Sequence, residues 1–480
     1  MCAAMSHHIQ GQGRHQVTLF PEALDDFVTE DNPVRVIDVF VDEADLNKLG
    51  FERVQAKCTG RPGYHPATLL KLYIYGYLNR IQSSHRLEKE SHRNIELMWL
   101  LERLKPDFKT IADFRKDNGK AIKNVCRQFV ELCRQMNMFS ESLIAIDGSK
   151  FKAVNNKSRN YTPSKVKFHI TRVEKSIQEY LDNLDAKDRE SCQSDEKVPS
   201  SKLEWLKTRL VELREMEKAV QAHPDKQVSL TDPDSRLMKL HHMNRHVSYN
   251  VQSAVDTKRH LIVSHDIVQS TYRGYLTLVA EQVQQALNKQ DITVIADKGY
   301  FSRLDIKVLQ DSGAKALVPQ TDTSGSKAKG IFNKSLFKYD KEKDVYICPA
   351  NNELPYRSDS MEKDIKLKVY VDHIACRDCS IRSRCTTASY EPRKMRRWIH
   401  EEMIYDMQAR LNAAPETAII RKQTVEHPFG TIKMWMGSTH FLMRRMDNVK
   451  TEMSLHVLAY NLRRMISIFG VPRLIAAMRA

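Results

Sequence analysis

The stretch LIAIDGSKFKA, residues 143–153, decides how the centre of this chain folds. Its aliphatic run predicts a buried β-strand, and an Asp-Gly pair follows that run. Asp-Gly after a strand is a common turn signal, so Asp147 and Gly148 have an ordinary interpretation as residues that end the strand. The alternative is that Asp147 is a carboxylate held at the end of a rigid strand in order to bind a metal ion.

A second stretch, VIADKG at residues 294–299, repeats the pattern of an apolar strand closed by an aspartate. Reactive side chains of open α/β sheets gather where strands end, because the sheet fixes the backbone there while the end faces solvent. If the two strands are neighbours, Asp147 and Asp297 can share a metal ion although they lie 150 residues apart. An aspartate that ends a strand is otherwise an ordinary turn residue.

The order of the segments around these strands predicts a mixed α/β sheet. A hairpin of two β-branched runs at residues 246–270 precedes a helix, the second aspartate strand, another helix and a short strand. Before that hairpin, residues 161–224 carry two narrow apolar stripes, typical of an inserted pair of antiparallel helices. The chain is predicted to be helical up to residue 135 and again after residue 395.

Composition limits the class of protein. The 480 residues include 76 Lys and Arg against 60 Asp and Glu, a formal charge of +16 that favours a nucleic acid over an anionic membrane surface. No window approaches about eighteen uninterrupted apolar residues, and the first residues do not read as a secretion signal. We therefore expect a cytoplasmic protein without a membrane helix. The basic N-terminal helices suit a DNA-binding module, although a solvated helical bundle would account for them equally well.

A third acidic candidate lies in RKQTVEHPFGTIKMWMG, residues 421–437. Glu426 and Lys433 are seven residues apart, about two helical turns, so a helix would place them on one face. Arg421 and Lys422 precede the glutamate by roughly one turn. A carboxylate flanked by cations on one helix face fits a metal ligand beside a phosphate backbone. The same arrangement also fits a ladder of surface ion pairs. The proline two residues after the glutamate is expected to break the ideal helix.

Three carboxylates of this kind have a chemical rationale. Phosphodiester hydrolysis and strand transfer need an activated water or 3′-hydroxyl and a stabilised leaving oxygen, and two Mg²⁺ ions about 4 Å apart provide both. Mg²⁺ prefers oxygen ligands and keeps several of its waters, so three carboxylates are enough to hold it.

On these motifs the chain resembles the DDE transposases of bacterial insertion sequences, specifically the group with a Cys-rich insertion in the catalytic core. IAIDGSKFKA, VIADKGYFS and VEHPFGTIK resemble the three acidic motifs of that family, in order, and SYNVQSAVD resembles its middle strand. GRPGYHPATLLKLYIYGYLNRIQSSHRLEKESHRNIELMWLL and PDFKTIADFRKDN resemble its helical N-terminal domain. The resemblance covers nearly the whole chain.

The resemblance implies an α/β fold with an RNase H-like mixed-sheet catalytic core. Asp147, Asp297 and Glu426 would be the catalytic acids and the ligands of two Mg²⁺ ions, with Mn²⁺ able to substitute. The implied reaction is cleavage of DNA strands at transposon ends and their transfer to target DNA. The implied partners are double-stranded DNA, as terminal inverted repeats and as target, and a second copy of the chain. Bound to DNA, a bacterial protein of this kind would be associated with the nucleoid.

The resemblance also marks candidate DNA contacts around the glutamate. The related signature carries a tyrosine and then an arginine four residues before the glutamate, and those positions are Ile419 and Lys422 here. Arg421 lies next to the second of them, and Lys433 matches the associated lysine of the motif. We therefore expect Arg421, Lys422, Lys433 and His427 to contact DNA.

Four of the nine cysteines cluster, at Cys348, Cys376, Cys379 and Cys385. One CxxC pair and two further cysteines in a short segment fit a tetrahedral structural Zn²⁺ site, and the polar residues around them would hardly fold without such a staple. Four reduced thiols in a small insertion are the alternative. The odd total does not suggest a framework of disulfides.

The predicted organisation has five parts. They are a helical DNA-binding domain at 1–135, the first part of the core at 136–160 and 225–320, a helical-hairpin insertion at 161–224, a Cys-rich insertion at 321–395, and a helical part of the core at 396–480. Two other functions fit the same residues: a nuclease of this fold that does not transpose, and an inactive DNA-binding repressor. The three intact acids count against the repressor.

Overall fold

The computed structural model describes residues 23–55, 63–139, 142–190, 200–239, 244–269, 274–320, 330–362, 365–388 and 390–480. The chain divides into two compact units, residues 1–126 with 453–480, and residues 127–452. Helices α6 (Gly119–Gln135) and α14 (Met446–Phe469) each contribute residues to both units.

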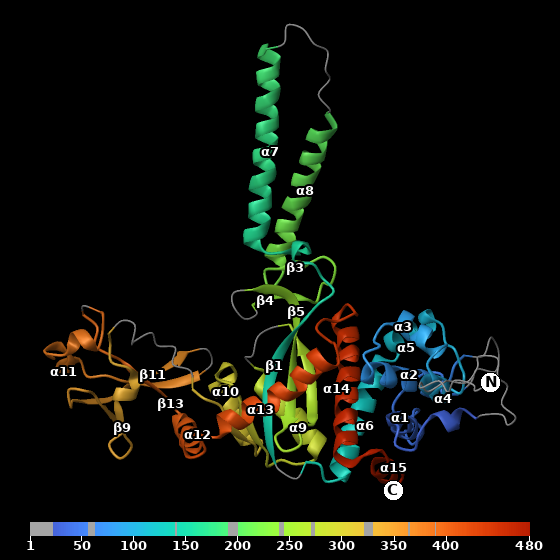
Figure 1. Cartoon of the computed structure of the whole chain (residues 1–480). Helices are drawn as coiled ribbons and strands as arrows, with labels where there is room; N and C mark the ends of the chain where they lie inside the picture. The colour runs from blue at the N-terminus through green and yellow to red at the C-terminus, as the bar shows by residue number, and fades with distance from the viewer. Residues whose placement is uncertain are drawn as a thin grey trace, which may run out of the picture. The chain divides into compact units, whose positions relative to one another are not determined.

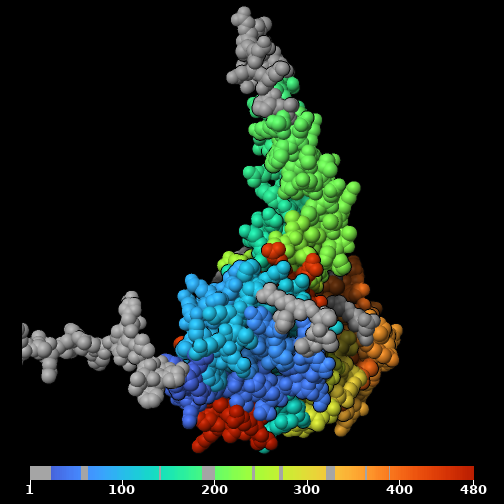
Figure 2. Space-filling model, turned by 90° about the vertical axis from the view of Figure 1, so that its right-hand side faces the viewer, coloured from blue at the N-terminus to red at the C-terminus, as the bar shows by residue number. Residues whose placement is uncertain are grey.

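The first unit is built from helices, as predicted. Its elements, besides parts of α6 and α14, are η1 (Leu24–Phe27), α1 (Pro33–Asp42), α2 (Pro66–Leu78), α3 (Ser84–Ser91), α4 (Ile95–Leu100), α5 (Phe108–Asp117) and α15 (Val471–Arg479). Leu70, Tyr73 and Tyr77 of α2 are fully buried and form the centre of its core. In Figure 2 the C-terminal helix α15, red, lies against the blue helices of this unit.

The second unit is centred on a six-stranded sheet. Its strands are β1 (Leu143–Lys152), β4 (Arg236–Lys239), β5 (Arg245–Asp256), β6 (Ile262–Val268), β7 (Thr293–Ala296) and β8 (Lys315–Leu317). On one side of β1, β5 pairs antiparallel, and β4 and β6 pair with successive parts of β5. On the other side β7 and β8 follow as parallel strands. This strand order is that of an RNase H-like core and confirms the predicted mixed sheet; β4 was not predicted.

The prediction that Gly148 ends the first strand is wrong. β1 continues through it to Lys152, and its pairing with β5 runs without a break from Ile144↔Asp256 to Lys152↔Ser248. The long antiparallel partner therefore overrides the local turn signal. What does end at this point is the parallel pairing with β7, whose last register is Ile146↔Ala296.

Helices cover both faces of the sheet. On one face, α9 (Tyr275–Leu287), α10 (Arg303–Asp311) and α12 (Glu401–Ala413) share an apolar cluster with Ile144 and Ile146 of β1. On the other face, Val425 of α13 (Thr417–Gly430) packs against Ala145 of β1 and Ile295 of β7. Figure 1 shows α13 crossing in front of β1. Alternate residues of β1 thus point to opposite helical layers, as the pleat of a strand requires.

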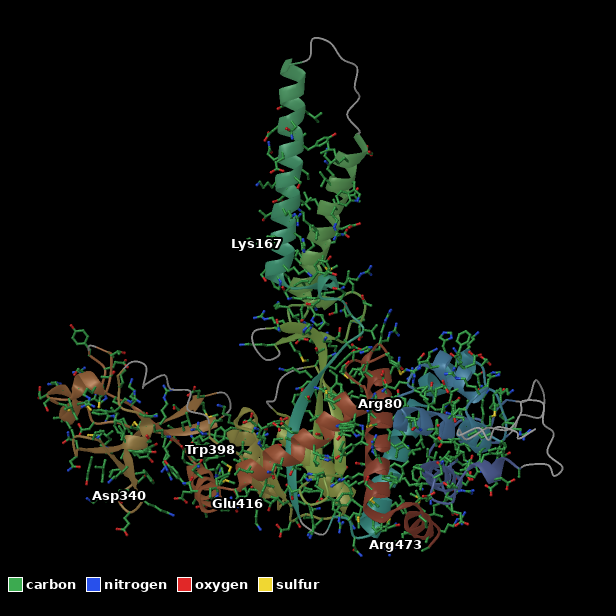
Figure 3. All side chains as sticks on the ribbon, in the orientation of Figure 1. Arg80, Lys167, Asp340, Trp398, Glu416 and Arg473 are labelled. Carbon is green, nitrogen blue, oxygen red and sulfur yellow. The ribbon has the colours of Figure 1, made fainter. Side chains whose placement is uncertain are left out.

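The predicted helical hairpin is confirmed as α7 (Pro163–Glu190) and α8 (Ser200–Ala222). It is inserted between two short antiparallel strands, β2 (Asn160–Tyr161) and β3 (Val228–Ser229). Near this base a small apolar cluster joins the two helices; its buried members are Tyr161, Val166, Leu213 and Val220. Lys167, labelled in Figure 3, follows the cluster residue Val166 on α7.

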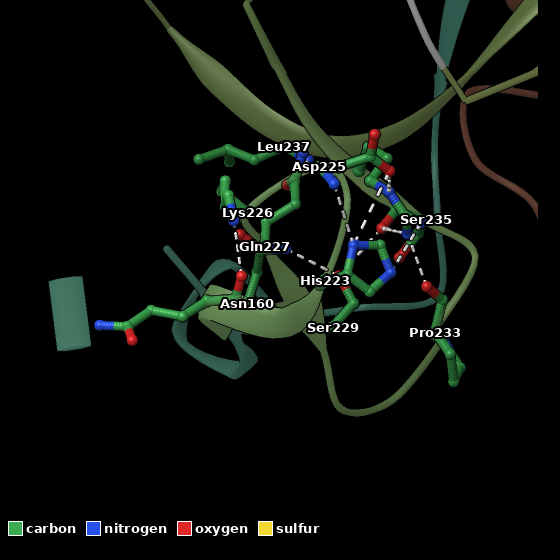
Figure 4. Close-up of polar contacts among 11 residues, drawn as sticks. Asn160, His223, Asp225, Lys226, Gln227, Ser229, Pro233, Ser235 and Leu237 are labelled. Carbon is green, nitrogen blue, oxygen red and sulfur yellow. Dashed lines mark hydrogen bonds and ion pairs between the residues drawn. The ribbon is translucent and has the colours of Figure 1, made fainter. Parts of the chain in front are cut away.

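Polar contacts close the base of the hairpin (Figure 4). Asn160 Nδ2 donates to Ser229 Oγ at 2.7 Å, and that hydroxyl donates to the carbonyl of Ser235 at 3.0 Å. Arg236 pairs with Asp225 at 2.8 Å. These contacts tie the insertion to β4 at the edge of the sheet.

The Cys-rich segment contains a five-stranded antiparallel sheet that the sequence analysis did not predict. Its elements are η6 (Lys334–Leu336), β9 (Lys338–Asp340), β10 (Val345–Ile347), β11 (Glu353–Glu362), β12 (Ile365–Tyr370), α11 (His373–Arg377), η7 (Arg382–Arg384) and β13 (Met395–Trp398). Tyr339 and Tyr370 both donate to Asp344 at 2.6 Å within an aromatic cluster. The segment therefore has a small apolar core of its own, against which Cys348, Cys376 and Cys385 pack.

The last strand of this segment also reaches the main core. Trp398, labelled in Figure 3, is 2% exposed and belongs to the same apolar cluster as Leu367 and Met407. The C-terminal region that was assigned to the core as residues 396–480 is divided at Glu452, and its last 28 residues group with the N-terminal helices.

Candidate active site

Asp147 and Asp297 occupy matching positions on adjacent parallel strands. Each is the residue that follows the last paired position, Ile146↔Ala296, of β1 and β7. Since side chains alternate along a strand, both carboxylates leave the sheet on the face that α13 covers. The predicted adjacency of the two strands is confirmed, and it brings together two acids that lie far apart in sequence.

The local hydrogen bonding of the two aspartates is alike. Oδ1 of Asp147 accepts the backbone N–H of Gly148 at 2.7 Å, and Oδ1 of Asp297 accepts that of Lys298 at 2.6 Å. Asp297 begins the short 3₁₀ turn η4 (Lys298–Tyr300), which the chain enters directly from β7. Each carboxylate is thus oriented by its own backbone, with its second oxygen directed away from that bond.

Glu426 lies on α13, one residue after the side chain that packs on the two strands. The helix continues through Pro428 and passes directly into a π-helical turn, Thr431–Trp435, so the expected break at the proline is wrong. The Glu426 side chain is exposed, and within the described ranges its carboxylate has no ion-pair partner. The third acid therefore lies on the helix that packs against β1 and β7.

Arg421 makes a contact that the sequence analysis did not foresee. Its Nη1 lies 3.2 Å from Oδ2 of Asp147. Burial raises the pKa of Asp147 above its ordinary value; the bond from the Gly148 amide and the charge of Arg421 lower it, and the charge of Asp297 raises it. The two aspartates are therefore close enough to influence each other's charge. Lys422, the position matching the family's arginine, is exposed instead.

Lys433 is directed toward β1. Its ammonium donates to Ser149 Oγ at 2.6 Å and to the carbonyl of Lys150 at 3.0 Å, and lies 4.5 Å from the centre of the Phe151 ring. Burial lowers the pKa of Lys433 to about 8. The lysine thus anchors the π-helical turn to the strand that carries Asp147.

His427 stacks on His260, which lies in the turn between β5 and β6. Their ring centroids are 5.0 Å apart and the rings are nearly parallel, at 16°. His427 is exposed on its other side, next to Glu426. A pair of stacked rings therefore borders the helix that carries the third acid.

The four clustered cysteines lie around one small cavity. Cys348 follows β10, Cys376 lies in α11, Cys379 follows α11, and Cys385 ends η7. All four are partly buried and free of disulfides. Burial raises the pKa of Cys376 and of Cys385, and the charges of the neighbouring thiols raise both further. The thiols are therefore near one another, although they come from separate elements.

No group of three or more His, Cys, Asp or Glu side chains among the described residues is arranged to enclose a metal ion. At the acidic site Asp147 is paired with Arg421. In the cysteine cavity all four thiols belong to the lining.

Two family models match the sequence. A model described as a transposase domain matches residues 22–117, and one described as a transposase DDE domain matches residues 225–462. The chain belongs to the DDE transposases. Asp297 and Glu426 lie within the second match, and Asp147 lies before it on the central strand of the same sheet.

A solved structure similar to this transposase is the synaptic complex of piggyBac transposase with hairpin DNA. The identity is 8%, the match covers 94% of this chain and 79% of that chain, and the TM-score is 0.30. A likeness of this degree carries no argument, so the fold assignment rests on the strand order and the family models. No curated protein matches the sequence.

The family assignment makes this protein a DNA transposase, of an enzyme class that uses divalent metal ions. No helix in the described ranges of the transposase is long and apolar enough to cross a bilayer. The three candidate acids can be read from their motifs. The contact of Arg421 with Asp147 cannot, because it depends on how α13 packs on the sheet.

Proposed function

We propose that this transposase cleaves and joins DNA strands with Asp147, Asp297 and Glu426 as the ligands of two Mg²⁺ ions, for which Mn²⁺ can substitute. The three side chains supply the hard oxygen donors that Mg²⁺ prefers. Bound there, the metal would activate a water or 3′-hydroxyl and stabilise the leaving oxygen.

The observation that carries this proposal is the register of β1 and β7. The two aspartates follow the same rung of a parallel ladder, Ile146↔Ala296, and face the same helix. The helix residue next to Glu426 packs one rung earlier, on Ala145 and Ile295. The three acids thus lie on two adjacent strands and on the helix packed against them, which supports their use as one metal site.

The residues of the chain prepare this site in two ways. The amides of Gly148 and Lys298 hold one oxygen of each aspartate, which leaves the other oxygen for the metal. Arg421 neutralises Asp147 before the metal binds, and is then available to a phosphate of the substrate. Together they keep two like charges beside each other, which would otherwise repel.

The proposed substrate is double-stranded DNA, in the form of the transposon's terminal inverted repeats and of target DNA. The formal charge of +16 attracts such a polyanion, and Arg421, Lys422, His427 and Lys433 lie on the helix and turn that carry the third acid. We further propose that two copies of the chain act together on paired ends.

We also propose that Cys348, Cys376, Cys379 and Cys385 bind one structural Zn²⁺. The support is their common cavity and the soft, tetrahedral donor set that four thiolates provide. Four thiolates leave no open coordination position, so the metal would hold α11 and η7 against β10 and take no part in the reaction.

Cleavage and joining of a duplex built from the DNA that flanks the coding sequence tests the proposal. Wild type with Mg²⁺ is expected to do both, and Asp297→Asn to bind DNA and do neither. Asp291→Asn is the matched control, since Asp291 is an exposed aspartate paired with Lys315 at the other end of β7. Cleavage that survives Asp297→Asn contradicts the proposal. Wild type that cuts without joining would be a nuclease, and binding without cleavage would indicate a repressor.

A further inference from the structure

Tyr300 ends the turn that begins at Asp297, and its ring lies on the opposite side of the sheet from the acids. It is fully buried in the apolar cluster that contains Ile146 and Ala296, beneath the helices of that face. Its hydroxyl donates to Oε1 of Gln252, a fully buried residue of β5. The turn that carries Asp297 is thus fastened to a strand on the far side of β1.

Gly148 lies between these two side chains. It is the register partner of Gln252, so its missing side chain would point to the same face. A Cβ at this position would lie 2.9 Å from Oδ1 of Asn250, 3.1 Å from the Tyr300 hydroxyl, and closer still to the amide of Gln252. Because these groups are fully buried, they have little room to move away. The glycine next to Asp147 is therefore needed for space and not for a turn.

The Tyr300–Gln252 bond lies beyond the last backbone pair that joins β1 to β7. The hydrogen-bonded pairing of β1 with β7 stops at Ile146↔Ala296, one residue before the two acids. Beyond it, Asp297 belongs to the turn η4, in which the amide of Tyr300 donates to the carbonyl of Asp297 at 2.9 Å. Any movement of that turn would change the separation of the two carboxylates.

We propose that the Tyr300–Gln252 bond, admitted by Gly148, is a positioning device that holds Asp297 at the separation from Asp147 that metal binding requires. Tyr300 touches neither substrate nor metal and acts through the acid three residues before it. The inference rests on the proposed function, because it takes both aspartates as ligands of one Mg²⁺ site.

The test is the Mg²⁺ dependence of DNA cleavage. Tyr300→Phe keeps the buried ring and removes only the hydroxyl, and Gln252→Met removes the acceptor while leaving Tyr300 in place. We expect either substitution to raise the half-saturating Mg²⁺ concentration about tenfold, with much of the rate recovered at high Mg²⁺. Gly148→Ala is also expected to raise the half-saturating Mg²⁺ concentration.

Tyr249→Phe is the matched control. Tyr249 is a fully buried tyrosine of the same strand as Gln252, and its hydroxyl bonds Asp232 at 2.9 Å, away from the acids. Its loss should lower the melting temperature and leave the Mg²⁺ dependence unchanged. The proposal is overturned if Tyr300→Phe and Gln252→Met show the Mg²⁺ dependence of wild type, whatever their melting temperatures. Mg²⁺-dependent cleavage that persists in Asp297→Asn would instead overturn the proposed function itself.

Discussion

Arg421 of α13 lies 3.2 Å from Asp147 of β1 and pairs with the carboxylate oxygen that its backbone bond leaves available. Both side chains are mostly shielded, with 21% and 25% of their surfaces exposed. The pair therefore joins the helix of the third acid to the strand of the first acid, and it places a positive charge where a metal ion would bind.

This ion pair should weaken the binding of metal to the DNA-free protein. We expect Arg421→Gln to tighten Mn²⁺ binding roughly fivefold, because about 1 kcal/mol of charge repulsion is removed. The same substitution should slow DNA cleavage, since the proposed phosphate contact is lost. Calorimetric titration with Mn²⁺ measures the first effect. Lys422→Gln is the control, an exposed lysine one residue away, and equal titrations for Arg421→Gln and wild type would contradict the expectation.

The charge of Lys433 should determine how the rate of DNA cleavage changes at alkaline pH. Burial lowers its pKa to about 8, so its charge is present below that pH and is lost as the pH rises through it. If the charged form contacts DNA phosphate, the cleavage rate should fall about tenfold per pH unit above about 8. Lys433→Arg keeps its charge throughout and should extend activity to higher pH. Superimposed pH profiles of wild type and Lys433→Arg would argue against a role for this charge; Lys422→Arg serves as the control.

The sequence was sufficient for features that depend on local pattern. Apolar runs closed by aspartates located β1 and β7, and narrow stripes of helical period located the inserted hairpin. The sequence was insufficient where contacts between distant segments determine the end of a strand or the partner of a side chain. The Asp-Gly signal at Asp147 gave way to pairing with β5, and the contact of Arg421 joins residues 274 positions apart. In the Cys-rich segment, strands such as β12 alternate lysine with apolar residues, so their periodicity was taken for polar irregular sequence.

The cysteine cluster predicts one bound zinc ion per chain. Elemental analysis of protein purified without chelator should find it, and Cys385→Ser should lose it because a three-thiolate set binds zinc less tightly. Cys192→Ser, a cysteine outside the cluster and outside the described residues, is the control. A zinc content near zero in wild type would leave four reduced thiols as the better description.

The helical hairpin should be separable from the catalytic core. Its apolar cluster lies near the base and includes no described residue between Val173 and Leu213, so shortening the hairpin preserves the cluster. Replacing residues 176–211 by a short Gly-Ser turn should change the melting temperature by less than about 4 °C. Val166→Asn, a polar substitution inside the cluster of the full-length hairpin, should lower it more. A larger loss in the shortened chain than in Val166→Asn would show that the distal hairpin supports the core.

The most direct measurement of the central claim is the metal preference of Asp297→Cys in DNA cleavage. A thiolate is a poor ligand for Mg²⁺ and a better one for Mn²⁺. If Asp297 holds the catalytic metal, the variant should lose cleavage at least a hundredfold in Mg²⁺ and regain a large part of it in Mn²⁺, while wild type works with both. Cleavage at the wild-type rate in Mg²⁺, or an equal loss in both metals, would contradict the assignment of Asp297 as a metal ligand.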